Sequence, residues 1–126
     1  NNSDLLEIDD TSAVYPDLTV EESTLLGLNR GYYTDIHIYY VNAFTSGITG
    51  RAYPKERTST DGVIVTSISS ANIHTAHEVG HLLIGPGHHP NPNNLMYDTP
   101  TLWSTELDLN QINAILNSVY VIYESQ

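Results

Sequence analysis

The chain has 126 residues, of which 15 are acidic and 4 are basic, so its formal net charge is −11. This acidic excess argues against a nucleic-acid-binding protein, because such a protein needs a basic surface. The sequence contains no cysteine and no long apolar run, so we expect neither a disulfide framework nor a membrane span. The length suits a single core, and we treat residues 1–126 as one domain.

Residues 5–41 predict a strand or arm, then a helix, then a strand. Residues 5–8 are largely apolar and indicate a first strand or an ordered arm. Residues 19–22, Thr-Val-Glu-Glu, have the spacing of a capping box, which predicts a helix that ends at residues 29–31. Residues 33–41 are rich in aromatic and β-branched side chains, which favours a strand. We expect His37 within it to be an ordinary strand histidine rather than a metal ligand.

Two shorter stretches predict the rest of a sheet. Residues 51–54 indicate a strand at a sheet edge, because Pro54 cannot donate a ladder hydrogen bond. Residues 63–68 are mostly apolar or β-branched, which is typical of a central strand. A helix is then expected over residues 73–84. Together these elements predict an α+β fold, in which a small twisted mixed sheet of about three to five strands packs on this helix.

The predicted helix carries the motif H-E-x-x-H as His77, Glu78 and His81. Residues four apart lie on one face of a helix, so the two imidazoles can bind one Zn²⁺. Glu78 lies next to the first histidine and can reach a water at such a metal. This is the arrangement that a metal-assisted hydrolase requires.

The residues after this motif turn the chain back. Residues 85–87 read Gly-Pro-Gly, which must end the helix. A turn there can bring a third imidazole to the metal, from His88 or His89. Three protein ligands are the pattern of a catalytic zinc site, whereas structural zinc sites have four.

Residues 74–97 resemble the signature of metzincin zinc endopeptidases, H-E-x-x-H-x-x-G-x-x-H followed by a methionine turn. Gly85 and His88 come one residue later than in that signature, which we interpret as a one-residue insertion in the turn. Met96 lies eight residues after His88 and is followed by Tyr97, as in matrixin-like members of the clan. This spacing favours His88 over His89 as the third ligand.

The resemblance implies a compact zinc-dependent endopeptidase with one catalytic Zn²⁺. Three histidines would be its metal ligands: His77, His81 and His88. Glu78 would act as the general base that activates the zinc-bound water for attack on a peptide bond. Met96 would form an apolar floor beneath the histidines, and Tyr97 beside it would be a packing residue of the methionine turn.

The resemblance also implies how substrate binds. In metzincins an edge strand pairs with the extended substrate, and this role would belong to Ala52 and Tyr53. The alternative for Tyr53 is a side chain that only packs at the sheet rim. A C-terminal helix is expected over residues 105–120. Apolar side chains recur there at helical spacing, at Leu109, Ile112, Ile115, Leu116 and Val119.

Two other interpretations stay open. In gluzincins the third ligand is a glutamate on a later helix, and Glu106 could take that role here. The chain could instead be a non-catalytic zinc-binding or interaction domain, although a structural site has no use for a general base such as Glu78. We expect a monomer that acts on protein or peptide substrates. A cysteine-free chain is compatible with secreted and cytosolic proteins alike, and we expect a secreted or extracytoplasmic one.

Overall fold

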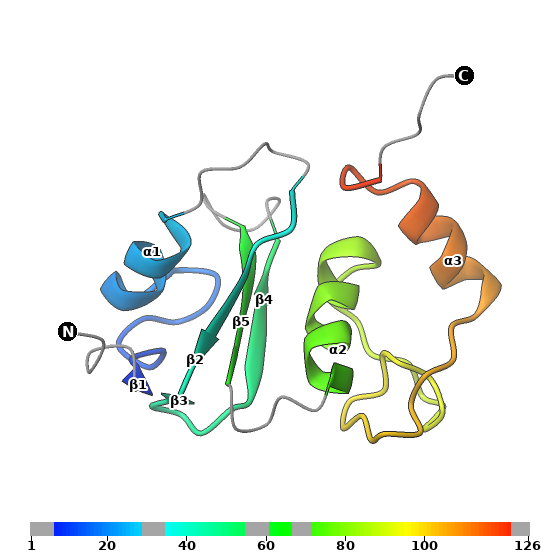
Figure 1. The fold of residues 1–126 in the computed structure, drawn as a ribbon, viewed down its shortest axis with the longest axis horizontal. Helices are drawn as coiled ribbons and strands as arrows, with labels where there is room; N and C mark the ends of the chain where they lie inside the picture. Colours follow the sequence, from blue (N-terminus) through cyan, green and yellow to red (C-terminus); the bar gives the residue numbers. More distant parts are fainter. Residues whose placement is uncertain (1–6, 29–34, 55–60, 67–71, 122–126) are drawn as a thin grey trace.

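The computed structural model describes residues 7–28, 35–54, 61–66 and 72–121 (Figure 1). These residues form a small α+β protein with three helices and a mixed sheet, as the sequence predicts. Its elements are β1 (Glu7–Ile8), α1 (Val20–Leu26), β2 (Ile38–Val41), β3 (Ala43–Phe44), β4 (Gly50–Tyr53), β5 (Gly62–Thr66), α2 (Asn72–Leu83) and α3 (Leu109–Leu116). None of the helices in these ranges is long and apolar enough to cross a membrane.

The main sheet has three strands in the order β2-β5-β4. Strand β5 runs parallel to β2 and antiparallel to β4. All five residues of β5 are buried, which explains their apolar and β-branched composition and confirms the predicted central strand. Strand β4 is at the edge, as predicted. The two-residue strands β1 and β3 pair in parallel as a separate small sheet.

Two apolar clusters hold the layers together. On one face of the sheet, Leu25 and Leu26 of α1 pack against Ile64 of β5. On the other face, Leu82 of α2 packs against Val63 and Val65 of the same strand. The sheet therefore lies between α1 and α2, and α3 lies beyond α2 (Figure 1).

The capping box at the start of α1 is confirmed. The Thr19 hydroxyl accepts a hydrogen bond from the Glu22 backbone N–H at 3.1 Å, and the Glu22 carboxylate accepts from the Thr19 N–H at 3.0 Å. The helix ends at Leu26, with Gly27 as its C-cap. It is therefore shorter than predicted, and the expected stop at residues 29–31 lies outside the described residues.

Three other predicted boundaries differ from the structure. Strand β2 begins only at Ile38, since residues 35–37 belong to no strand, and residues 33 and 34 lie outside the described ranges. Strand β5 ends at Thr66, and residues 67 and 68 are likewise not described. Helix α3 covers Leu109–Leu116 rather than residues 105–120. Asp108 and Gln111 form a second capping box that starts α3, and Asn117 caps its end, so the helix extends in neither direction.

Candidate metal centre

The turn of α2 between His77 and His81 rests on Met96. A Cβ atom placed on Gly80 would lie 2.3 Å from the Met96 sulfur, so only glycine allows this approach. Met96 is 1 % exposed, and its backbone N–H donates to the Asn94 side chain at 2.9 Å. The methionine thus lies under the helix as a buried packing residue.

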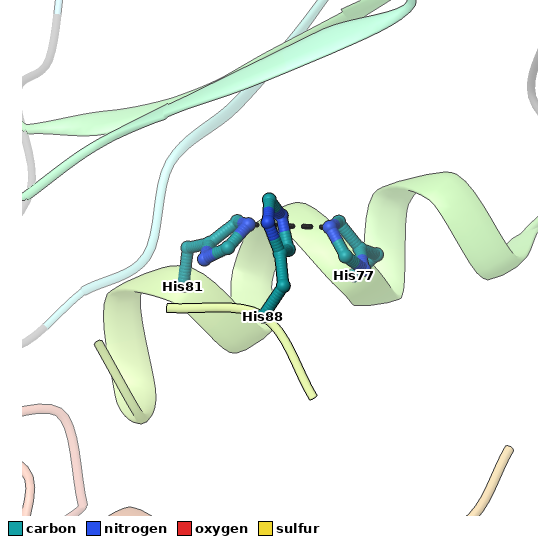
Figure 2. Close-up of side chains that lie close together, drawn as sticks. All are labelled: His77, His81 and His88. Atoms are coloured by element: carbon teal, nitrogen blue, oxygen red, sulfur yellow. Dashed lines mark hydrogen bonds between the residues drawn. The ribbon is translucent and has the colours of Figure 1, made fainter. Parts of the chain in front are cut away.

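Three histidine rings converge at this point (Figure 2). His77 and His81 project from α2, and His88 comes from the segment that follows the helix. Each offers one ring nitrogen to a group whose atoms all lie within 4.8 Å of one another. Ring centroids are 4.7 Å apart for His77 and His81, and 5.0 Å apart for His81 and His88. The group is close enough to hold a metal ion.

Hydrogen bonds to backbone carbonyls fix how the two helix histidines are oriented. His77 Nδ1 lies 2.7 Å from the carbonyl oxygen of Leu95, and His81 Nδ1 lies 2.9 Å from that of Gly85. A carbonyl can only accept, so each Nδ1 carries the proton. In the neutral ring Nε2 then holds a lone pair, and this is the nitrogen that each histidine turns inward.

These two lone pairs face each other. The Nε2 atoms of His77 and His81 are 3.2 Å apart. Burial lowers the pKa of both imidazoles, so both favour the neutral form. Two neutral rings with Nδ1 protonated have no proton to share between their Nε2 atoms. A cation between them would satisfy both, and two ligands at about 2.0–2.1 Å in tetrahedral geometry lie about 3.3 Å apart.

His88 is the more exposed member of the group. Its side chain is 41 % exposed, and its Nδ1 lies 3.3 Å from a carboxylate oxygen of Asp98, which is 74 % exposed. The carboxylate engages the same ring nitrogen that carbonyls engage in the other two histidines. Asp98 therefore leaves the Nε2 atom of His88 available for a metal ion, as the carbonyls do for His77 and His81.

The other candidate ligands lie elsewhere. Both ring nitrogens of His89 are occupied, because Nε2 lies 3.1 Å from the Asp108 carboxylate and Nδ1 accepts the Asn91 N–H at 3.1 Å. Glu106 pairs through its backbone with residues 93 and 95 and does not belong to the histidine group. His37, just before β2, does not belong to it either.

Glu78 lies between the histidines and the sheet edge. A Cβ atom on Gly50 would lie 2.9 Å from Glu78 Cγ, so the carboxylate side chain packs directly on β4. Burial raises the Glu78 pKa to about 7, against the opposing effects of the Arg51 charge and of a hydrogen bond from the Ala52 N–H. A carboxyl group with a pKa near neutrality can both take up and release a proton there.

An open cleft joins these groups. Its volume is about 650 Å³, and its walls include Glu78, the three histidines, Asp98 and the residues of β4 from Gly50 to Ala52. A smaller hollow of about 280 Å³ adjoins it, bordered by Asp98, Thr99 and Pro100. The segment after Met96 thus forms a wall next to the histidines.

The register of β4 distinguishes the two residues that are predicted to contact substrate. The Thr66 N–H donates to the Thr49 carbonyl at 2.9 Å, so residues 49, 51 and 53 turn their backbone groups toward β5. Gly50 and Ala52 therefore turn theirs outward, toward the cleft. Tyr53 does not, and its side chain is 0 % exposed. Its hydroxyl donates to the Glu22 carboxylate on the opposite face of the sheet.

Gly50 is thus a position in the candidate site that sequence reasoning missed, and a signal for it was present. A glycine at the start of a strand often marks a close approach by another group, which here is the Glu78 side chain.

No family model, no curated protein and no solved structure matches the chain. The interpretation of the site therefore depends on its own geometry.

Proposed function

We propose that this chain is a zinc-dependent endopeptidase of the metzincin type. The observation that carries the proposal is the pair of buried Nε2 atoms, 3.2 Å apart, whose rings donate their other N–H to carbonyls. With His88 they make a set of three imidazoles beside a buried carboxylate. Such a set suits a catalytic Zn²⁺, which when bound supplies Lewis-acid chemistry and an open coordination position.

Glu78 is the group that would move the proton. Its carboxylate lies in the cleft between the histidines and β4, and burial raises its pKa to about 7. As a general base it takes a proton from the attacking water. The same carboxyl group then delivers that proton to the leaving amine, which must be protonated as the peptide bond breaks.

Strand β4 offers the surface that would hold the substrate. It is an edge strand, and the outward backbone groups of Gly50 and the Ala52 carbonyl face the cleft. An extended peptide can add to such an edge as a further strand. Because Glu78 accepts the Ala52 N–H, the bound peptide would run past the general base.

The gluzincin alternative has no structural support, because Glu106 is held by backbone pairing away from the histidines. The non-catalytic alternative does not account for Glu78. A structural metal site needs ligands and no general base, whereas the Glu78 carboxylate lies buried beside the histidines in an open cleft, a position that suits proton transfer.

The test measures metal content and peptide cleavage on the same samples. We expect near one zinc per chain in the wild type and in His89→Ala, and a large loss in His88→Ala. Glu78→Gln should keep the metal and lose cleavage of a mixed peptide library. Cleavage by Glu78→Gln at the wild-type rate would show the mechanism to be wrong, and a zinc-loaded wild type that cleaves no peptide would show the function to be wrong.

A further inference from the structure

We propose that Tyr15 determines specificity: its ring forms the wall of a subsite that accepts one large apolar side chain of the bound peptide. This inference rests on the proposed function, since it assumes an extended peptide along β4. It adds a residue from a part of the chain that the metzincin signature does not cover.

Tyr15 reaches the cleft from the segment that joins β1 to α1. Its partly buried ring packs on the core cluster beneath α1. The ring also lines the same cleft as Glu78 and the histidines, together with Ile48 and Pro54. The cleft thus continues past the edge of β4 onto an apolar surface that these three residues provide.

Arg51 holds the ring in place. Its guanidinium carbon lies 5.9 Å from the centroid of the Tyr15 ring, within the range of a cation–π contact. The guanidinium in turn lies 3.5 Å from a carboxylate oxygen of Asp10 and 3.5 Å from one of Glu22. Both carboxylates are buried, and Asp10 is itself fixed by the backbone N–H of Ser46 at 2.9 Å. The wall is therefore formed before any ligand binds, which favours affinity.

In an extended peptide paired with β4, every second side chain would point to the face of the sheet where Tyr15 lies. The Cβ positions of Gly50 and Ala52 lie on the α2 side of the sheet, near Glu78 and Leu82. Arg51 lies between them and therefore points to the opposite side, where Tyr15 is. A substrate residue opposite Arg51 would point the same way, because paired residues share a face.

The charges around the subsite select against acidic side chains. Arg51 is the single lysine or arginine within the described ranges, and two buried carboxylates face it. Within this described group one positive charge faces two negative ones, so the group itself repels an incoming carboxylate. The substrate side chain that fits this subsite is an aromatic or large aliphatic one, which packs on the Tyr15 ring.

The test uses metal-loaded Glu78→Gln, so that peptides bind without cleavage. A single phenylalanine is moved along a fluorescent alanine–serine peptide, and the dissociation constant is measured for each position. We expect one position to bind about tenfold more tightly, as half-burial of an aromatic side chain implies. Glutamate there should bind more weakly than alanine. No preferred position, or a preference for glutamate, would overturn the subsite.

Variants tie the preference to the ring. Adding Tyr15→Ala to Glu78→Gln should remove the preference, whereas Tyr15→Phe should retain it. Tyr40→Ala is the matched control, because Tyr40 is 56 % exposed on the opposite edge strand of the sheet. A preference that survives Tyr15→Ala would overturn the proposal.

A second measurement keeps Tyr15 intact, in case its removal disturbs folding. A benzoylphenylalanine at the preferred peptide position should cross-link to Tyr15 or Ile48, and cross-links confined to residues 99–103 would overturn the subsite. Cleavage by the wild type is scored separately. A wild type that shows the preference and cleaves nothing would contradict the proposed function alone, and one that cleaves without the preference would contradict the subsite alone.

Discussion

Gly80 lies directly on the sulfur of Met96, where a Cβ atom would approach to 2.3 Å. No side chain tolerates so short a contact, and Met96 is 1 % exposed and cannot move into solvent without repacking. The contact lies at the level of α2 from which His77 and His81 project. The packing of this one pair therefore sets the height of the helix above the methionine turn.

Gly80→Ala should therefore destabilise the protein, although alanine is normally the better helix former. We expect a loss of about 1–3 kcal/mol in the free energy of unfolding, the usual cost of overpacking a core. Urea denaturation measures it. Gly87→Ala is the control, because a Cβ there meets nothing within 4 Å. Combining Gly80→Ala with Met96→Ala should cost less than the sum of the two single changes, and strict additivity would contradict the predicted clash.

The pKa shifts of His77 and His81 predict how the metal-free protein responds to pH. Burial lowers the pKa of both rings below the ordinary value of 6.5. Below about pH 6.5 the unfolded chain takes up protons that the native rings do not, so stability falls as the pH falls. The loss continues until the pH passes the lowered native pKa values.

Urea denaturation in a chelator between pH 7.5 and 5 measures this dependence. The decrease in the free energy of unfolding per pH unit should be smaller in His77→Gln and in His81→Gln. Each variant removes one of the two histidines with a lowered pKa. Added zinc should raise stability at pH 7.5 by about 2.7 kcal/mol at a hundredfold excess over its dissociation constant, and this gain should shrink as the pH falls. Equal slopes in the wild type and both variants would contradict the assignment.

Much of the site could be predicted because its determinants are local. The spacing of His77 and His81 places both on one face of a helix whatever surrounds it. The box from Thr19 to Glu22 satisfies backbone groups within a single turn. A Gly-Pro-Gly turn must return the chain toward the helix, and it brings His88 rather than His89 to the group.

The features that the sequence did not predict depend either on contacts between residues distant in the sequence or on a second local motif near the predicted boundary. Tyr53 faces the side of the sheet where Glu22 lies, and its hydroxyl donates to that carboxylate, 31 residues away in the sequence. The predicted start of the C-terminal helix at residue 105 is wrong, because the capping box from Asp108 to Gln111 starts α3 at Leu109 although the apolar periodicity alone does not mark that boundary. That box was visible in the sequence, whereas the Tyr53 contact was not.

Tyr53→Phe separates the buried role of this tyrosine from the predicted contact with substrate. Its hydroxyl donates to the Glu22 carboxylate on the face away from the cleft. Removing that bond leaves a buried charge with one partner fewer, at a cost of about 1.5–3 kcal/mol in the free energy of unfolding. Peptide cleavage should be unchanged under conditions where the variant is folded. A raised KM with unaltered stability would instead support a substrate contact.

Gly50→Ala should impair the proposed catalysis without removing the metal. A Cβ there would lie 2.9 Å from Glu78 Cγ and 3.0 Å from Val65 Cγ1. The valine is β-branched and buried in the central strand, so Glu78 is the group that must move. Displacing a general base by about 1 Å can reduce the rate on the order of 10- to 100-fold, and we expect the fall in kcat rather than in KM.

Zinc content per chain should stay at the wild-type level, because the three atoms nearest to a Cβ at Gly50 belong to Glu78 and Val65 and to no histidine. Gly87→Ala again serves as the matched glycine control and should keep its kcat. If Gly50→Ala lost zinc in parallel with activity, the effect would lie in the metal site. An unchanged kcat with full zinc would mean that the position of Glu78 against β4 does not limit the reaction, and that its role as general base must be reconsidered.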